Sequence, residues 1–203
     1  MKKISKLYVR LCSFIVSIFF WLVFKIFWGF KIEGKENLPP QGPYFIVANH
    51  QHMFDPTLIA GSNMFKQIFF MAKEELFKYS IGNLFFRSIG AFPVKRGKPD
   101  RYAIRTTLQH IKDGYIVCLF PEGTTQGHDV IGEAKDSVAK LLYMANAKVV
   151  PAYINLNRWK RPVSIKYGEA FTISFGDERP TKEQLVQKSQ EIMDKIKAIR
   201  ENK

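Results

Sequence analysis

The sequence predicts an α/β fold with a largely parallel central sheet flanked by helices. Short apolar runs rich in β-branched and aromatic residues, which are typical of buried strands, alternate with longer stretches whose apolar residues recur at helical spacing. Strands that alternate with helices form βαβ units, and such units build parallel sheets. The chain has 203 residues, which suffices for one domain with a substantial core.

The first element is expected to be a membrane-associated helical segment. The chain starts with basic residues, and residues 11–24 are uncharged and nearly all apolar. This run is shorter than the roughly 20 residues that span a bilayer, and residues 30–33 make a poor signal-peptide cleavage site. We therefore expect an uncleaved helix that dips into one leaflet or lies at the interface, with Trp21 and Trp28 at headgroup depth. A signal peptide and a core helix of a soluble domain are the alternatives.

The elements of the first half follow from apolar runs and turn residues. Two prolines and a glycine make residues 31–42 a connector. Pro56 suits the first position of a helix and Asp55 suits its N-cap. The expected elements are strands at 44–48, 67–72 and 91–94, a helix at 56–65, and a mixed apolar stretch at 74–86.

Capping residues mark the helices of the second half. Asp100 is expected to cap a helix that ends at Gly114, and Thr181 with Gln184 forms a capping box at the start of a final helix. The expected elements are strands at 115–120 and 148–154, a helix at 135–147, a β pair of 163–167 with 170–174 around Gly168, and a helix at 181–200.

Two polar side chains follow the strand at 44–48. His50 and Asp55 are five positions apart, and neither a helix nor a strand places such residues on one face, so they meet only if the segment turns. An imidazole held by a carboxylate at a strand end is a general-base arrangement. Taken alone, the pair is more often a loop histidine and a simple cap. His52, three positions from Asp55, competes for the same role.

A second polar cluster, Phe-Pro-Glu-Gly-Thr at residues 120–124, follows the strand at 115–120. Because the carboxyl ends of parallel strands meet at one edge of a sheet, Glu122 and His50 are expected to converge there. Lys95 and Arg96 follow the strand at 91–94. On sequence alone, a solvated basic loop explains these two residues as well as a binding role does.

Four blocks in order resemble the 1-acylglycerol-3-phosphate acyltransferases, a glycerolipid acyltransferase family with an HxxxxD motif. They are residues 49–55 with His50 and Asp55, residues 90–97, the FPEGT sequence at 120–124, and a strand with a central proline at 149–154. The resemblance covers residues 34–155. It implies residues 1–33 as the membrane-associated segment and residues 34–203 as the acyltransferase domain.

The resemblance implies transfer of a fatty acyl group from a thioester, carried by coenzyme A or acyl carrier protein, to the hydroxyl of lysophosphatidic acid, which gives phosphatidic acid for phospholipid synthesis. It implies His50 as the general base with Asp55 as its partner. The implied substrate-binding residues are Lys95, Arg96, Glu122, Gly123 and Thr124. Acylation of glycerol-3-phosphate or another lysophospholipid, and a non-catalytic lipid-binding protein of the same fold, remain open.

The sequence departs from the family in two places. Thr125 replaces the usual arginine of the FPEGTR block, and Ser137 stands where a Lys-x-Gly element has its glycine. Lys95 or Lys135 could supply the missing charge, as a point charge rather than a bidentate fork. Glu122 could bind a glycerol hydroxyl or hold the basic loop through an ion pair, and the second role is favoured.

The formal charge of +13 and the pI of about 9.7 predict an anionic partner. The basic residues are spread along the chain without a nucleic-acid-binding signature, so we expect an anionic membrane surface and no nucleic acid. Cys12 and Cys118 make no disulfide framework, which favours a reducing compartment. We expect the cytoplasmic face of the cell membrane, no metal and no cofactor besides the acyl donor.

Overall fold

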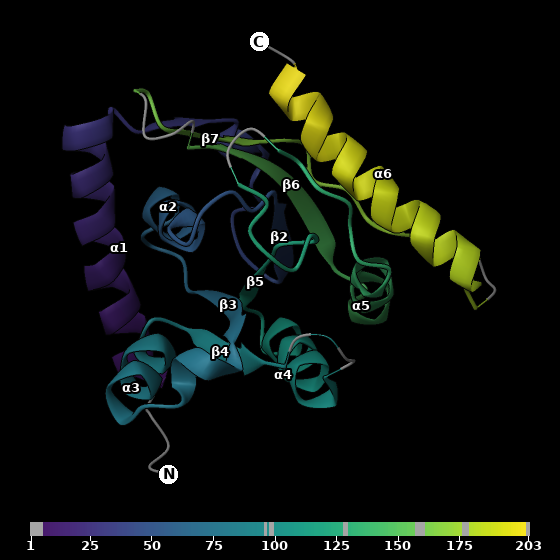
Figure 1. Cartoon of the computed structure of the whole chain (residues 1–203), viewed down its shortest axis with the longest axis horizontal. Coiled ribbons are helices and arrows are strands. Elements are labelled where there is room, and N and C mark those ends of the chain that lie inside the picture. Colours follow the sequence, from purple (N-terminus) through teal and green to yellow (C-terminus); the bar gives the residue numbers. More distant parts are fainter. Residues whose placement is uncertain are drawn as a thin grey trace.

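The computed structural model describes residues 6–95, 97, 100–127, 130–156, 161–175 and 179–201. Its centre is a seven-stranded sheet with the order β1-β7-β6-β2-β5-β3-β4 (Figure 1). The strands are β1 (Lys31–Glu33), β2 (Tyr44–Ala48), β3 (Ile68–Lys73), β4 (Ala91–Val94), β5 (Ile116–Leu119), β6 (Lys148–Asn155) and β7 (Ser164–Tyr167). The helices are α1 (Lys6–Trp28), α2 (Asp55–Ser62), α3 (Ser80–Ser88), α4 (Arg101–Lys112), α5 (Ser137–Ala145) and α6 (Lys182–Glu201), with short 3₁₀ helices η1 (Lys35–Asn37) and η2 (Glu74–Phe77).

Among the strands of the described residues, five of the six pairings are parallel, and β6 with β7 is antiparallel. Alternation along the strands sends side chains to two cores. On one face, Ile46 and Cys118 pack in a cluster with residues of α1 and α2. On the other face, Phe45 and Val117 pack with residues of α4, α5 and α6. The predicted α/β fold with a largely parallel sheet between helices is therefore confirmed.

The helix signals of the second half are confirmed in detail. The Asp100 carboxylate accepts hydrogen bonds from the backbone N–H groups of Tyr102 and Ala103, and so caps α4. Gly114 follows α4 with a φ of 83°, a left-handed conformation that glycine adopts without strain. Thr181 and Gln184 exchange the two hydrogen bonds of a capping box.

Two predicted segments are wrong because long-range pairing decides them. Residues 31–42 are not only a connector, since β1 pairs with β7, about 130 residues away. Residues 170–174 do not pair with β7. Instead, the chain runs on past Gly168 along β6, where Phe171 bridges to Val149. A Cβ on Gly168 would lie 3.0 Å from a Pro151 side-chain carbon and 2.7 Å from Ile199, so close packing explains this glycine better than a hairpin turn does.

Helix α1 joins the core along one side only. Phe24 is 2% exposed and packs in the cluster beneath the sheet, as does Phe30 just after the helix. The other side exposes a stripe of large apolar residues, namely Leu7, Leu11, Ile15, Phe19, Leu22 and Ile26. With 23 residues, α1 is long and apolar enough to cross a membrane. Because few of its apolar side chains are buried, α1 differs from the core helix of a soluble domain.

His110 makes the stability of the fold depend on pH. Its ring on α4 stacks on Phe69 with centroids 3.7 Å apart, and Phe92 lies 5.4 Å away. Burial lowers the pKa of His110 from 6.5 to about 4, with a smaller opposing effect of Asp113 and a lowering effect of Lys6. Between these pH values the unfolded chain binds a proton that the folded chain does not. The free energy of unfolding therefore decreases as the pH falls from 6.5 to 4.

We expect this loss to be about 1–2 kcal/mol, because the ring is only half-buried and solvent screens its charge. Replacing His110 with phenylalanine should keep the stacking and remove the dependence. Chemical denaturation in detergent at pH 7 and pH 4.5 measures the difference for both proteins. An equal loss of stability in the two proteins would show that other groups cause it.

Candidate active site

The loop after β2 is tied to the neighbouring strand β6. Asn49 donates a hydrogen bond from Nδ2 to the Ile154 carbonyl (3.0 Å) and accepts one from the Ile154 N–H at Oδ1 (2.7 Å). The Gln51 Oε1 accepts from the N–H of Leu156 (3.2 Å). These side chains continue the ladder beyond the last paired residue of β2. The residue between them, His50, is held at the carboxyl edge of the sheet.

His50 and Asp55 are in contact, as their spacing in a turn predicts. The His50 Nδ1 lies 2.8 Å from the Asp55 Oδ2, and this oxygen also accepts the N–H groups of Gln51 (2.7 Å) and His52 (2.8 Å). Asp55 is fully buried and His50 is 9% exposed. A carboxylate at Nδ1 favours the tautomer with its proton there, which leaves the lone pair on Nε2.

The expectation that Asp55 caps α2 is wrong. Asp55 is the first residue of the helix and Phe54 occupies the N-cap position. The Asp55 carboxylate therefore turns back to the loop that precedes it. His52 does not replace His50 in the pair, because its ring lies on Phe54 and only its backbone N–H reaches the same carboxylate.

Glu122 fixes the loop that carries His50. Its Oε2 accepts the N–H of His50 (2.8 Å) and its Oε1 accepts the N–H of Gly132 (3.0 Å). The side chain is 3% exposed. Burial raises the pKa of Glu122, and the two backbone hydrogen bonds oppose that rise. Among the described residues the carboxylate has no ion pair and accepts from two backbone segments. An ion pair with the basic loop stays a prediction, because Arg96 lies outside the described residues.

Phe120 and Gln126 complete the contact between the two loops. The His50 ring stacks on Phe120, with centroids 4.2 Å apart and an interplanar angle of 20°. The N–H of Gln126 donates to the carbonyl of His50 (2.9 Å). Residues 120–126 thus hold His50 by its ring, its N–H and its carbonyl group. The expected convergence of His50 and Glu122 is confirmed.

Lys135 lies over the turn at Gly123. Gly123 has a φ of 69°, and a Cβ there would lie 2.5 Å from the Lys135 Cε and 2.6 Å from its Nζ. The N–H of Lys135 donates to the carbonyl of Pro121 (3.0 Å). Thr124 and Thr125 follow the turn and are exposed. An ammonium group thus lies beside the turn that precedes Thr125, the position where the resemblance led us to expect an arginine.

Lys95 is at the same edge of the sheet, farther from His50. It follows β4, which lies three strands from β2, so about 14 Å separates the two strand ends. The Lys95 side chain is exposed, and its Nζ lies 3.6 Å from the Glu74 Oε1. Its N–H donates to Asp100 (2.8 Å). Arg96 lies outside the described residues.

The described residues contain no group of three His, Cys, Asp or Glu side chains that could hold a metal ion. Cys118 is fully buried, and burial together with the charge of Asp55 raises the pKa of its thiol well above the ordinary value. Its neutral thiol is therefore not a nucleophile. Sequence reasoning missed Gln51 and Phe120 as supports of His50, because no residue pattern marks a stacking partner or a backbone clamp.

The chain is similar to known acyltransferases over the part that contains the candidate active site. A family model described as Acyltransferase matches residues 29–155. A "1-acyl-sn-glycerol-3-phosphate acyltransferase" of Bacillus subtilis is 36% identical over 124 residues, which is 61% of this chain and 61% of that protein. A protein with the same description in Streptococcus pneumoniae is 33% identical over 121 residues, covering 59% of this chain and 44% of that one. The matches thus span less than two thirds of these relatives.

A solved structure shares the fold. The crystal structure of the 1-acyl-sn-glycerophosphate acyltransferase PlsC from Thermotoga maritima superposes with a TM-score of 0.71 and 25% sequence identity, covering 93% of this chain and 78% of that chain. The family model covers residues 29–155 of 203 and includes His50, Asp55 and the FPEGT segment. The chain therefore belongs to the acyltransferase family.

Proposed function

We propose that the protein transfers a fatty acyl group from an acyl thioester to the hydroxyl of lysophosphatidic acid, giving phosphatidic acid. The observation that carries this proposal is the 2.8 Å contact of a buried carboxylate with the Nδ1 of His50 at the carboxyl edge of the sheet. The descriptions of the relatives from Bacillus subtilis and Streptococcus pneumoniae support lysophosphatidic acid as the acceptor. The reaction is proposed to need no cofactor besides the acyl donor.

The proposed chemistry starts from the weak acidity of the acceptor hydroxyl. His50 takes the hydroxyl proton at Nε2 while the oxygen attacks the thioester carbonyl. The negative Asp55 stabilises the imidazolium that forms. When the tetrahedral intermediate collapses, the carbon–sulfur bond breaks and the imidazolium returns its proton to the leaving thiolate. The acceptor oxygen is itself the nucleophile, so no acyl-enzyme forms, and a trapped one would contradict this order of steps.

The acceptor phosphate is proposed to lie between the turn at Gly123 and the basic residues after β4. The turn at Gly123 is followed by the exposed Thr124, and Lys135 lies over that turn. Lys95 follows β4, and Arg96, next to it in the sequence, is proposed to bind the phosphate as well. Lys95 would exchange the exposed contact with Glu74 for the phosphate. Glu122 contributes by holding the turn and the His50 loop together.

Replacing Arg96 or Lys135 with an uncharged side chain (Arg96→Ala, Lys135→Met) should raise the KM for lysophosphatidic acid about tenfold to a hundredfold, because a charge-assisted hydrogen bond to phosphate is lost. The KM for the acyl donor should change little. Steady-state kinetics with each substrate varied in turn measures both values. Lys140→Met, an exposed position on α5, is the matched control. An equal rise in both KM values would indicate a structural role.

We propose that residues 1–33 seat the protein on the cytoplasmic face of the cell membrane and that residues 34–203 form the acyltransferase domain. The exposed stripe of α1 supports the first part, and the formal charge of +13 suits an anionic surface. The match of the family model from residue 29 onward supports the boundary.

Introducing charge into the stripe (Ile15→Glu with Phe19→Glu) should move most of the protein from the membrane pellet to the soluble fraction, because a carboxylate at the lipid interface is costly. Val186→Glu, at an exposed apolar position on α6, is the matched control. Deleting residues 1–30 is a poorer test, since it removes Phe24 and Phe30 from the core. Unchanged sedimentation of a folded stripe variant would place the anchor elsewhere, for example on α3.

The function itself is tested by a mass-spectrometric product screen of the full chain. The acceptors are lysophosphatidic acid, glycerol-3-phosphate and lysophosphatidylcholine, each with acyl-coenzyme A and with acyl-acyl carrier protein. Phosphatidic acid is the expected product, and it should be absent with His50→Ala. Product from glycerol-3-phosphate alone would overturn the acceptor. The lack of any product from folded, membrane-bound protein would overturn the activity.

A further inference from the structure

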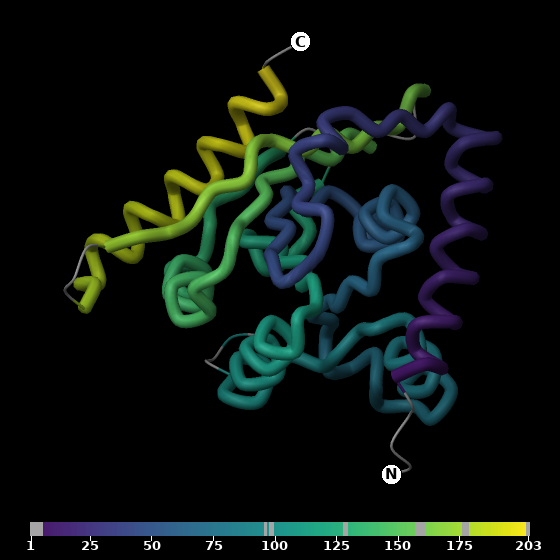
Figure 2. Tube along the Cα trace, turned by 180° about the vertical axis from the view of Figure 1, so that it is seen from behind, coloured from purple at the N-terminus to yellow at the C-terminus, as the bar shows by residue number. Residues whose placement is uncertain are grey.

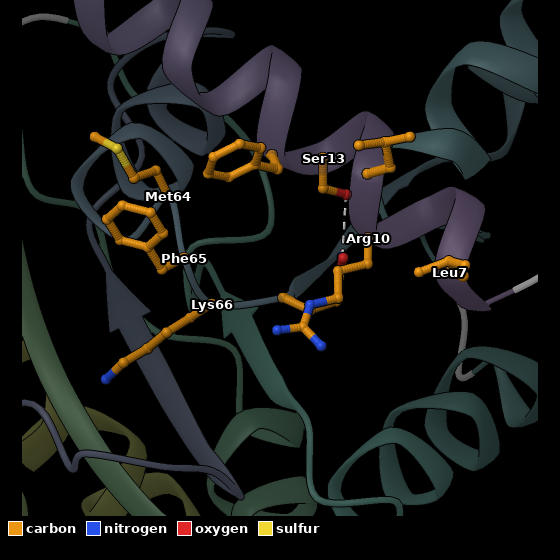
Figure 3. A pocket seen from close by; sticks show the side chains of 9 residues that line it. Leu7, Arg10, Ser13, Met64, Phe65 and Lys66 are labelled. Atoms are coloured by element: carbon orange, nitrogen blue, oxygen red, sulfur yellow. Dashed lines mark hydrogen bonds between the residues drawn. The ribbon is translucent and has the colours of Figure 1, made fainter.

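A cavity of about 290 Å³ lies between the first turns of α1 and the loop that joins α2 to β3 (Figure 3). Ser13 and Gln67 connect its two walls by a hydrogen bond of 3.2 Å. The loop precedes the amino end of β3, whereas His50 follows the carboxyl end of β2. The cavity is therefore at the opposite edge of the sheet from the candidate active site.

Helix α1 connects the two regions and sets their separation. Its residue Phe20 packs on Phe54 beside the His50 loop, with ring centroids 6.0 Å apart. Arg10 lines the cavity ten residues earlier, which is about 15 Å along a helix. Figure 2 shows the first turns of α1 beside α3. The cavity is thus separate from the proposed acyl-transfer site.

The walls of the cavity are apolar and open toward the surface of α1. Leu7 is 76% exposed and Phe65 is 77% exposed, although both line the same cavity. Phe14 lies against Phe65 with ring centroids 5.7 Å apart. Leu7 and Leu11 also belong to the exposed stripe of α1. The cavity therefore adjoins the surface that is proposed to face lipid, and acyl chains can lie against both.

The charges at the cavity are positive. The Arg10 side chain is exposed and extends beside the Ser13–Gln67 bond (Figure 3). Within the part of the chain that the structure describes, no carboxylate pairs with Arg10 or Lys66. The Lys66 ammonium donates to two neutral oxygens, the Pro39 carbonyl (2.7 Å) and the Tyr44 hydroxyl (3.3 Å). Two of its three N–H groups are thus used and one remains.

The surroundings of Lys66 increase the need for an anion. The side chain is half-buried, and this burial, together with the positive charge of Lys35, lowers its pKa. A negative group on this side of the cavity would offset both effects, although Figure 3 shows the Lys66 ammonium extending away from Arg10. Arg10 presents a planar fork of donors that matches a phosphate group. The apolar walls and the uncompensated cations together match a ligand that is anionic at one end and apolar at the other.

We propose that this cavity binds one anionic phospholipid of the membrane, with its phosphate on Arg10 and its acyl chains along Leu7, Leu11 and Phe65, while Lys66 adds positive charge on the opposite wall. The proposal goes beyond acyl transfer and rests only on α1 lying against lipid. The bound lipid would join the start of α1 to the loop before β3. It would hold the amino end of α1 on the sheet, whereas Phe24 anchors the helix near its carboxyl end.

Native mass spectrometry of the full chain in detergent tests the proposal, with phosphatidylglycerol and phosphatidylcholine of identical acyl chains as probes. We expect one phosphatidylglycerol per chain, bound about tenfold or more tightly than phosphatidylcholine. Arg10→Gln should weaken phosphatidylglycerol binding about tenfold, and Arg10→Lys should restore part of it. Lys25→Gln removes the same charge at the other end of α1 and should leave the affinity unchanged.

Three results would overturn the proposal. Equal retention of the two lipids would show that the cavity holds acyl chains without reading charge. Equal weakening by Arg10→Gln and Lys25→Gln, or binding of many lipids without saturation, would show general attraction to a basic surface. Displacement by excess inorganic phosphate, with no preference for the lipid, would make the ligand a free anion. These measurements report lipid binding and not acyl transfer. The lipid site can therefore fail its test while the proposed function passes, and the reverse.

Discussion

Replacing His50 with alanine is expected to lower the rate of acyl transfer by about a hundredfold to ten-thousandfold, the range for loss of a positioned general base. The acceptor hydroxyl would then lose its proton only to water. Phosphatidic acid formed per minute from lysophosphatidic acid and an acyl thioester measures the effect. Expression and sedimentation with membranes should be unchanged, because α1 and its exposed stripe are not altered.

The substitution is expected to leave the loop in place. The N–H of residue 50 still donates to Glu122, and its carbonyl still accepts from Gln126. Asp55 keeps two backbone donors, from Gln51 and His52, so its buried charge is not left without partners. The stability lost should be about 1 kcal/mol, from one hydrogen bond and the stacking on Phe120.

His52→Ala is the matched control for this experiment. His52 is an imidazole two positions away whose ring lies on Phe54, and its backbone N–H to Asp55 survives the substitution. It should retain most of the activity. Full activity of His50→Ala, or equal losses in the two variants, would remove His50 from the role of base.

The order of the elements and the edge that carries the site follow from the sequence, because local patterns decide both. Apolar runs mark the strands, and polar residues directly after β2 and β5 must share an edge when the strands are parallel. The contact of His50 with Glu122 was predictable for this reason. Asp55 shows the limit of a local rule. Aspartate does favour N-cap positions, but here the carboxylate binds three donors of the preceding loop instead of the N–H groups of the helix.

Other features depend on contacts that local sequence does not encode. The pairing of β1 with β7 needs two distant segments to meet, and the course of residues 170–174 depends on the length of β6. The role of Glu122 was predicted as structural, but its partners are backbone N–H groups, which no residue type announces. The position of Lys135 over Gly123 likewise arises from the path of the intervening chain. The net charge of the chain follows directly from its sequence, whereas the positions of the charged side chains depend on the fold.

Asp55→Asn should separate the electrostatic role of Asp55 from its structural role. The amide oxygen can still accept the N–H groups of Gln51 and His52, so the loop and the start of α2 should remain. The side chain no longer carries the negative charge that stabilises the His50 imidazolium. We expect kcat to fall by about a hundredfold to ten-thousandfold, comparable to loss of the carboxylate in a serine triad. The thermal midpoint should change by only a few degrees.

Asp55→Ala provides the contrast, because it leaves the buried N–H groups of Gln51 and His52 without an acceptor. Each such group costs about 1–3 kcal/mol, so this variant should lose both activity and stability. Asp113→Asn, which removes a charge far from the site at the end of α4, controls for the net charge. Kinetics and thermal unfolding on the same preparations give both quantities. If Asp55→Asn kept full activity, or lost activity only in proportion to folded protein, the carboxylate would be a structural anchor and His50 would act without its charge.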